Sequence, residues 1–361
     1  MNYNLLNLII GIISIITTIG GIGGSCFYIP LFCIVEKKSI EDAIPITLVT
    51  LFGDALIRFL FLINKKHPLC SNRYLINIHL VTLLSIYDSN LSFLGIFINE
   101  YLTSKIKKIL LTTILCVTLI RSIIHSFNIF HNSRREDQNT ILINIDGISF
   151  HIKQNTNSIE YSPDSKKEYI KSIIILIVIL LVVNLFVYLQ KKIKQYYTFV
   201  LILQMLFAYV IGTKISKHMI VTYENKKNNN FVFLPDDMIW NQTNVVKLIA
   251  IGSICGLVST SFGIGGSMIL LPIIIHTGVS PYVAIACTSV TSFISSISSC
   301  YNYAINNRID YQYSIPLAIS SGIGSYIGLL ITKKCKLFKK QYILSSLICI
   351  LLLISIVLIN I

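Results

Sequence analysis

Long apolar segments constrain the fold of this chain more than any other feature of its sequence. The run from Ile173 to Leu189 contains Asn184 as its one strongly polar residue, and the stretch from Tyr342 to Ile361 carries no charge. A helix needs about 20 mostly apolar residues to cross a bilayer, and only helices and closed barrels satisfy their backbone groups in lipid. Because these runs are continuous and not short alternating strands, they predict an all-α, polytopic membrane protein.

Charged residues are too few for an ordinary soluble protein. They make up 13% of the 361 residues, and 54% are apolar, whereas about a quarter of a soluble domain is charged. The formal net charge is +14, but the lysines lie in short clusters between apolar runs, as membrane orientation signals do. We therefore expect a lipid bilayer, and not nucleic acid, as the partner.

The nine cysteines do not form a metal-binding or disulfide pattern. Their number is odd, no C-x-x-C occurs, and most lie within apolar runs. Single cysteines in such positions behave as small hydrophobic residues. The sequence therefore predicts no metal site and no cofactor.

Ten apolar segments are predicted to be transmembrane helices. They cover about 5–34, 43–63, 74–98, 106–127, 169–189, 196–211, 245–276, 281–304, 311–331 and 342–359. Five regions follow: a first four-helix unit (1–127), a polar loop (128–168), a two-helix insert (169–212), a second polar loop (213–244) and a second four-helix unit (245–361). Within the first loop, Asp146-Gly147 between two alternating runs predicts a small β-hairpin from Thr140 to Ile152.

The orientation follows from basic residues in short loops, if each glycine-broken segment crosses the membrane once. With the N-terminus outside, thirteen basic residues fall inside and four outside. The inner set is Lys37, Lys38, Lys105, Lys107, Lys108, Lys191, Lys192, Lys194 and the five lysines from Lys333 to Lys340; the outer set is Lys65, Lys66, Arg73 and Arg308.

An internal repeat is the most specific motif. Gly21-Ile-Gly23-Gly24-Ser25 is followed by Pro30, and Gly263-Ile-Gly265-Gly266-Ser267 is followed by Pro272 at the same spacing. Further matches follow in the same order, listed here with their partners: Ala43-Ile44 with Ala284-Ile285, Thr47 and Thr50 with Thr288 and Thr291, and Ser92-x-x-Gly95 with Ser325-x-x-Gly328. The chain therefore reads as two similar four-helix units separated by the insert.

Such paired glycine runs predict a binding site. Broken helices at matching positions of two repeats mark the substrate site of many secondary transporters. The glycines allow the backbone to turn, and the half-helix that follows presents free amide groups and a positive dipole end to an anion. Pro30 and Pro272 lie within these half-helices and free further carbonyls. The alternative is close helix packing without a ligand.

The hydroxyl groups near the glycine runs are further candidates. Thr47 and Thr50 share a helix face, as do Thr288 and Thr291, with Ser289 beside them. Their hydroxyls are expected either to donate to a small anion or to bond back to carbonyls of their own helix.

These motifs resemble the TauE/SafE family of sulfite exporters, membrane transporters with two four-helix repeats. The family pattern has a G-x-G-G-G run and a proline in each repeat, then an A-x-x-T-S-like stretch that opens the next helix. The resemblance covers about 11–127 and 247–361, and Ser25 and Ser267 replace the third glycine. It implies export of sulfite, sulfonates or other small organic anions.

Ionisable residues inside predicted spans are the remaining candidates. Asp54 and Arg58 lie four residues apart, so they face the same way and form a pair, where the second unit has serines. Such residues usually mark a pathway, with Arg58 attracting the anion and Asp54 carrying a coupling proton, although a structural pair is the alternative. Asp88 is the next candidate.

The sequence thus predicts a secondary transporter for a small anion, coupled to a proton or another cation. A Walker A motif is missing, so ATP is not expected to drive it directly. The alternatives are a channel or a membrane assembly protein, and an intramembrane enzyme is expected less because no catalytic motif occurs. The predicted substrate-binding residues are Gly21, Gly23, Gly24, Ser25, Thr47, Thr50, Asp54, Arg58, Gly263, Gly265, Gly266, Ser267, Thr288, Ser289 and Thr291.

Overall fold

A computed structural model describes most of the chain. The described residues are 3–21, 23–67, 70–135, 140–145, 148–153, 161–163, 165–234, 237–277, 279–334, 349–350, 353–354 and 356–357.

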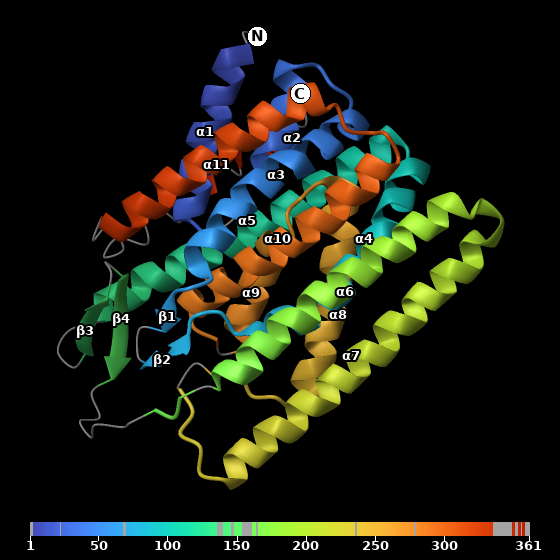
Figure 1. Ribbon diagram of the computed structural model, residues 1–361. Coiled ribbons are helices and arrows are strands. Elements are labelled where there is room, and N and C mark those ends of the chain that lie inside the picture. The colour runs from blue at the N-terminus through green and yellow to red at the C-terminus, as the bar shows by residue number, and fades with distance from the viewer. Residues whose placement is uncertain are drawn as a thin grey trace.

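The described part of the chain is almost entirely helical (Figure 1). Its first part contains α1 (Tyr3–Ile19), α2 (Ser25–Val35), α3 (Ile40–Leu62), β1 (Lys66–His67), β2 (Cys70–Tyr74), α4 (Ile78–Tyr101), α5 (Ser104–Arg135), β3 (Thr140–Ile145) and β4 (Ile148–Lys153). Its second part contains α6 (Lys166–Lys192), η1 (Lys194–Tyr196), α7 (Tyr197–Asn228), α8 (Gln242–Phe262), α9 (Ser267–His276), α10 (Pro281–Ile305) and α11 (Tyr311–Lys334).

Seven described helices are long and apolar enough to cross a membrane: α3, α4, α6, α7, α8, α10 and α11. The shorter α1 and α2 are also apolar. The predicted class, an all-α polytopic membrane protein, is therefore confirmed. The total of ten spans stays a prediction, because the last predicted segment, 342–359, lies largely outside the described residues.

Strands are confined, in the described part, to two small antiparallel pairs. β1 pairs with β2, and β3 pairs with β4 from Thr140 to Lys153. The second pair occupies the stretch where a hairpin was expected, although its turn residues, Asp146 and Gly147, lie outside the described residues.

The first glycine-broken segment turns back on itself. Ser14 in α1 and Tyr28 in α2 share a hydrogen bond of 2.7 Å, whereas in one continuous helix they would lie about 21 Å apart along the axis. Tyr3 donates to the carbonyl of Tyr313, and the Lys38 ammonium lies over the Tyr313 ring. The start of α1 and the end of α2 therefore lie at one end of the molecule, which we call the Tyr3 end.

The second broken segment enters from the opposite side (Figure 1). Trp240, just before α8, and Val283, in the first turn of α10, line one pocket together with Arg73. We call this side the Trp240 end. Since α9 lies between α8 and α10, α8 and α9 also form a hairpin within the membrane region.

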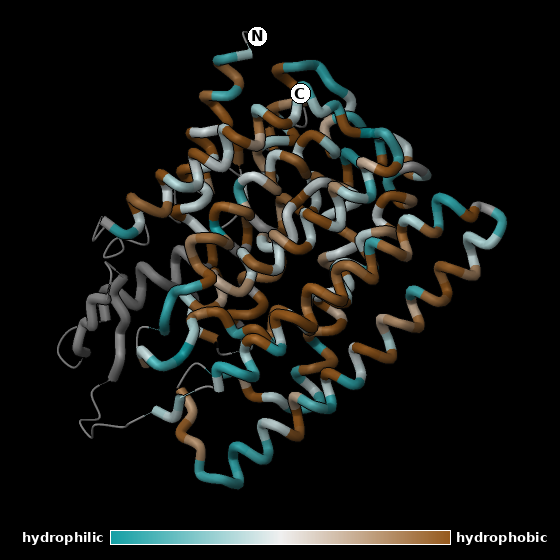
Figure 2. Tube along the Cα trace, viewed as in Figure 1, coloured by the Kyte–Doolittle hydropathy of each residue, from teal (hydrophilic) through white to brown (hydrophobic). Residues whose placement is uncertain are grey.

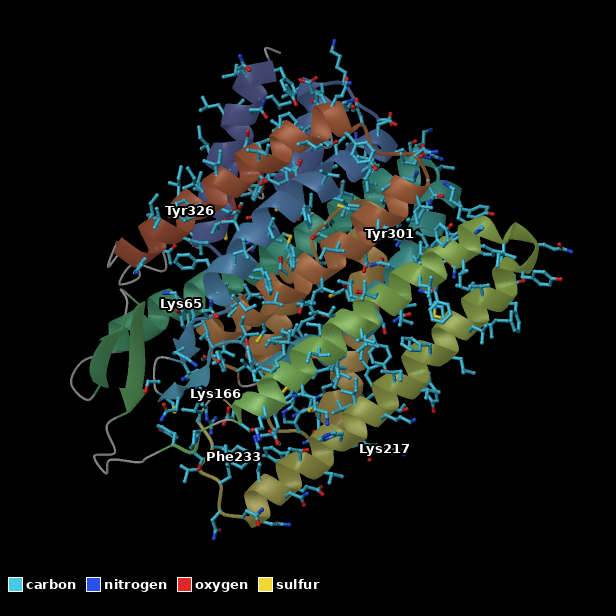
Figure 3. All side chains as sticks on the ribbon, in the orientation of Figure 1. Lys65, Lys166, Lys217, Phe233, Tyr301 and Tyr326 are labelled. Carbon is cyan, nitrogen blue, oxygen red and sulfur yellow. The ribbon has the colours of Figure 1, made fainter. Side chains whose placement is uncertain are left out.

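These two hairpins overturn the orientation count, which assumed single crossings. Lys65 and Lys166 lie toward the same end of the molecule (Figure 3), and α11 runs from Tyr313, at the Tyr3 end, to Lys333, at the other. Arg308, which was assigned to the side opposite Lys38, lies on the same side as Lys38. Lys333, which was assigned to the side of Lys38, lies on the opposite side. The excess of thirteen over four therefore disappears, and basic residues in short loops no longer indicate an orientation.

Helices from the first and second parts of the chain pack against each other. α1 packs along α11, and α8 packs along α4, while α3 contacts α10 and α11. A Cβ at Gly95 in α4 would lie 2.8 Å from the carbonyl oxygen of Leu257 in α8, and a Cβ at Gly328 in α11 would lie 2.8 Å from that of Ile15 in α1. The recurring Ser-x-x-Gly pattern thus has a packing reason: both glycines allow a helix from the other half to approach closely.

The insert packs on one side of this core. α6 and α7 contact α4. Large apolar side chains are exposed along α6 and along the first half of α7, where the chain is mostly hydrophobic (Figure 2). α7 continues to Asn228, so 213–228 is helix where a polar loop was predicted. Its last turns are helical because Met219, Ile220 and Tyr223 pack against the core, a contact that the local polar composition does not reveal. α5 likewise continues past the predicted end, Phe127, to Arg135.

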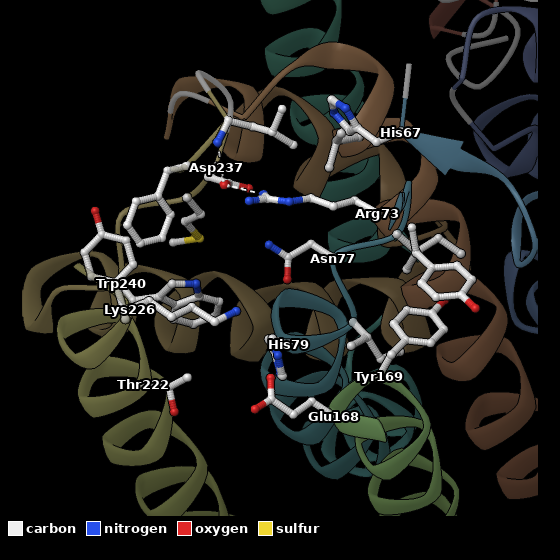
Figure 4. Close-up of a pocket in the computed structure, with 18 of the residues that line it drawn as sticks. His67, Arg73, Asn77, His79, Glu168, Tyr169, Thr222, Lys226, Asp237 and Trp240 are labelled. Atoms are coloured by element: carbon white, nitrogen blue, oxygen red, sulfur yellow. Dashed lines mark hydrogen bonds and ion pairs between the residues drawn. The ribbon is translucent and has the colours of Figure 1, made fainter. Parts of the chain in front are cut away.

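Arg73, in β2, joins the first half to the loops that flank the insert. Its Nε donates to the carbonyl of Ser162 at 2.7 Å, and its Nη2 donates to that of Val232 at 3.2 Å. Its Nη1 forms a 2.6 Å ion pair with Asp237, the dashed contact in Figure 4. With a side chain only 4% exposed, Arg73 holds these loops over the pocket at the Trp240 end.

Substituting Arg73→Ala should therefore loosen these loops. Removing Arg73 takes the cation from Asp237, which keeps its bond from the Leu234 amide, and takes a charged donor from the carbonyls of Ser162 and Val232. The loss is expected to lower the free energy of unfolding by about 1–3 kcal/mol. We expect a lower Tm and faster protease cleavage within 229–241. Lys217→Ala, on an exposed face of α7 (Figure 3), is the control and should change neither. Unchanged cleavage in the Arg73 variant would contradict this role.

Candidate functional site

Each break is a tight turn that needs glycine. Gly21 has φ of 71° and Gly263 has φ of 64°, and they are the glycines with positive φ in the described part of the chain. Other residues adopt this region at a cost, because Cβ crowds the backbone. The half-helices α2 and α9 then begin after Gly24 and Gly266, and neither N-terminus has a side-chain capping bond within the described region.

The two breaks meet in the interior. The Gly265 amide donates to Ser25 Oγ at 2.6 Å, although the two residues lie 240 positions apart. A Cβ at Gly23 would lie 3.2 Å from Ser267 Oγ, and a Cβ at Gly265 would lie 3.1 Å from Ser25 Oγ. The serine of each break therefore faces a glycine of the other, and the predicted glycine and serine residues are brought together.

Asp54 and Arg58 lie beside this crossing on α3. Arg58 Nη2 forms a 2.6 Å ion pair with Asp54 Oδ2, and the two side chains are 2% and 0% exposed. Thr18 and Ser325 donate to the other oxygen, Asp54 Oδ1. Both carboxyl oxygens are therefore compensated, and the carboxylate ties α1 and α11 to α3.

Arg58 retains unused donors. Its Nη2 would lie 3.5 Å from a Cβ at Gly23, so the guanidinium reaches the crossing. Its Nε and Nη1 are buried and have no hydrogen-bond partner among the described residues. Such unsatisfied donors are costly in a dry interior. They are available to an anion.

A small cavity adjoins these groups. It lies between α3, α10 and the second break, and its lining includes Leu51, Arg58, Ser259, Gly265, Gly266, Ser267, Ser292, Ser295 and Ser296. Ser267 Oγ and Ser292 Oγ are buried without a partner in the described part of the chain. Sequence reasoning missed the serines of α8 and α10. For the serines of α10 the signal was the serine-rich run from Ser292 to Ser299 inside an apolar segment.

Most of the predicted hydroxyl groups point back to their own helices. Thr50 donates to Ile46, Thr288 and Ser289 to Ile285, and Thr291 to Cys287, at 2.8–3.1 Å. This is the alternative to anion binding that the spacing left open. Thr47 Oγ1 differs, because it is buried and unpartnered among the described residues. The two prolines lie inside α2 and α9, as predicted.

A larger pocket opens at the Trp240 end (Figure 4). Arg73, His79, Glu168, Tyr169 and Trp240 line it, drawn from β2, α4, α6 and the loop before α8. None of the predicted site residues lies in it. Arg73 is already engaged with Asp237, so we place the candidate site at the crossing and not here.

Long apolar helices around a buried polar centre define an integral, multi-pass membrane protein. Comparison with known sequences then adds the family. Residues 248–360 match the family model of the sulfite exporter TauE/SafE family. The matched part contains the second break, α9, α10 and α11, whereas Asp54, Arg58 and Asp88 lie outside it.

Two relatives carry the same indication. Sulfite exporter TauE/SafE family protein 5 of Arabidopsis thaliana is 27% identical over 89 residues, which cover 25% of this chain and 20% of that protein. The probable membrane transporter protein YunE of Bacillus subtilis (strain 168) is 29% identical over 96 residues, covering 24% of this chain and 35% of that protein. The similarity therefore spans about a fifth to a third of each relative. These matches confirm the resemblance to the TauE/SafE family, and no solved structure matches significantly.

Proposed function

We propose that this protein is a secondary transporter that moves a small anion across a membrane. The observation that carries the proposal is the crossing of the two breaks, where Arg58 Nε, Arg58 Nη1 and Ser267 Oγ are buried donors without partners among the described residues. Donors held ready in a dry site favour an anion, and the N-termini of α2 and α9 add their dipoles. The names of the relatives, a sulfite exporter family protein and a membrane transporter protein, support the same class.

The substrate class follows from size and charge. The cavity has room for about one water molecule in this closed arrangement, and its lining combines hydroxyl groups and one guanidinium with the apolar side chains of Leu48, Leu51 and Ala55. These donors suit a compact oxyanion, which would enter when the surrounding helices move apart. Sulfite, a sulfonate or another small organic anion fits this description. Arg58 would contact the anion with its two free nitrogens, and Ser267 and Ser292 would complete the hydrogen bonds.

Alternating access would follow from the two halves. One break enters from the Tyr3 end and the other from the Trp240 end, and helices α1 and α8 pack against the opposite half. Rocking of the halves around the crossing would open the cavity to one side at a time. We propose the sequence repeat as the basis of this motion.

A carrier is favoured over a channel because the site is closed. Asp54 and Arg58 are almost fully buried, whereas a channel keeps a path for its ion. We propose no enzymatic role, since an activated serine needs a base and no histidine lines this cavity in the described part of the chain.

Flux measurements test the proposal. The purified chain is placed in liposomes, and uptake of radiolabelled sulfite, sulfate and methanesulfonate is followed with and without unlabelled anion inside. A carrier gives saturable uptake that internal anion accelerates. Non-saturable uptake without acceleration would identify a channel. Uptake equal to that of empty liposomes for all three anions would refute transport of this substrate class.

A further inference from the structure

Asp88 is a second buried acid next to the proposed anion site. It lies in α4, is 0% exposed, and packs against α8, where its carbonyl oxygen occupies the space that a Cβ at Gly256 would need. Its Oδ1 would lie 3.6 Å from a Cβ at Gly266, the residue before α9. Gly266 also lines the small cavity with Arg58. The carboxyl group of Asp88 therefore lies next to a residue that lines the cavity proposed for the anion.

The surroundings of Asp88 offer little compensation for a negative charge. Both of its carboxyl oxygens are buried and make no hydrogen bond of normal geometry within the described residues. The Ser295 hydroxyl on α10 approaches the carboxyl group and is the side chain that favours its charged form, whereas burial disfavours that form more strongly. On α8 the facing titratable group is the Cys255 thiol. The insert reaches α4 through Gln204, which donates to the carbonyl of Asn90. The cation that lines the small cavity, Arg58, is paired with Asp54.

The contrast with Asp54 separates two roles. Asp54 receives hydrogen bonds from Thr18, Ser325 and Arg58, so its charge is stabilised and its position is fixed. Asp88 has no comparable contacts in the described part of the chain, and an unpaired carboxylate in a dry interior is costly. The sequence pattern had assigned the coupling proton to Asp54. The contacts instead make Asp54 a positioning residue for Arg58.

We infer that Asp88 is the proton-binding group that couples anion transport to the proton gradient. The inference rests on the proposed transport function. An ionised Asp88 would repel an anion in the adjacent cavity, because like charges at this range interact strongly in a low-dielectric site. A proton from water on the entry side binds the carboxylate as the anion enters, and both leave on the other side. Each proton cancels one negative charge of the substrate, and anion and proton promote each other's binding by linkage.

The experiment uses methanesulfonate, which stays fully ionised across the working pH range, so that its own protonation does not enter. In liposomes containing the intact chain, a gradient of one pH unit, acidic on the entry side, should raise the initial flux by up to about tenfold, the ratio of proton concentrations. Asp88→Asn should transport with little response to the gradient, within about twofold, because the amide is permanently neutral. Asp88→Glu should retain the response.

A second measurement applies if Asp88→Asn binds the anion but does not transport it. In weakly buffered detergent solution, at a pH high enough to ionise Asp88 in the free protein, anion binding to the wild type should take up as much as one proton per anion, and Asp88→Asn should take up none. Thr112→Ala, at a partly exposed position of α5, is the matched control and should behave as wild type.

The outcomes separate the two proposals. If gradient stimulation or proton uptake persists in Asp88→Asn, the assignment of Asp88 is overturned, but the transport proposal stands. The same holds if the wild type shows saturable flux that does not depend on the pH gradient. If Asp88→Asn neither binds nor transports, restoration of coupled flux by Asp88→Glu supports the inference, and a folded but uncoupled Glu variant overturns it. Absence of saturable wild-type flux for every anion tested refutes the transport proposal itself.

Discussion

Replacing Arg58 by glutamine is expected to lower saturable anion flux by about 10- to 100-fold. A hydrogen bond to a charged group contributes about 1.5–3 kcal/mol, and each 1.4 kcal/mol corresponds to a factor of ten. The effect should appear mainly as weaker anion binding, since Arg58 Nε and Nη1 are the charged donors proposed for the anion. Competition of unlabelled anion against labelled uptake measures it. Arg308→Gln, at an exposed position, is the control and should leave uptake unchanged.

Stability distinguishes the roles of the two members of this pair. The single variant Arg58→Gln leaves Asp54 buried without its cation, which is expected to lower the free energy of unfolding by about 3–5 kcal/mol. The double variant Asp54→Asn, Arg58→Gln removes both charges and should recover most of that stability. Its flux should stay low. Recovery of flux together with stability would show that Arg58 acts only as a structural partner of Asp54.

Replacing Gly324 by alanine is expected to force α1 and α11 apart. A Cβ there would overlap the carbonyl oxygen of Gly11 and approach Cβ of Ser14 at 2.8 Å. The backbone of α1 cannot yield without moving the helix, so overpacking should lower stability by about 1–3 kcal/mol. Thermal unfolding of the purified protein in detergent measures the change.

Gly11→Ala is a matched control at the same crossing. A Cβ at Gly11 would lie 3.5 Å from the carbonyl oxygen of Ser320, an ordinary contact. Because alanine is the better helix former, this change should be neutral or stabilise by up to about 1 kcal/mol. Equal losses in the two variants would contradict the close approach at Gly324.

The glycine breaks could be located from the sequence to within a few residues. The predicted interruptions of 5–34 and 245–276 occur between Ile19 and Ser25 and between Phe262 and Ser267. Their direction could not be predicted. A turn of positive φ interrupts a helix wherever it occurs, but the following half-helix continues or reverses according to the partners it meets, here Tyr28 with Ser14. The orientation count failed for this reason.

The candidate site was predicted in part. The sequence singled out the Gly-Gly-Ser runs because the same pattern occurs twice. It singled out the Asp54–Arg58 pair because these residues are ionisable and lie in apolar surroundings. It did not identify Ser259, Ser292 and Ser295, because serines are common within membrane helices and their spacing alone does not point to a shared cavity. The sequence pattern also placed Asp54 before Asp88 as the candidate for the coupling proton. Spacing along one helix shows that Asp54 can pair with Arg58, but it does not show that Asp88 has no such partner.

The sequence by itself determined that this chain is a bundle of membrane helices with two glycine interruptions, because run length and the conformational freedom of glycine are local properties. Only the tertiary structure decided that the interruptions enter from opposite ends and meet, with Ser25 bonded to Gly265. Only the tertiary structure decided that Asp54 is satisfied by residues of α1 and α11 while Asp88 is not. The Ser25–Gly265 and Asp54–Ser325 contacts join residues 240 and 271 positions apart. Such contacts depend on how the first and second parts of the chain pack together, which no local pattern reveals.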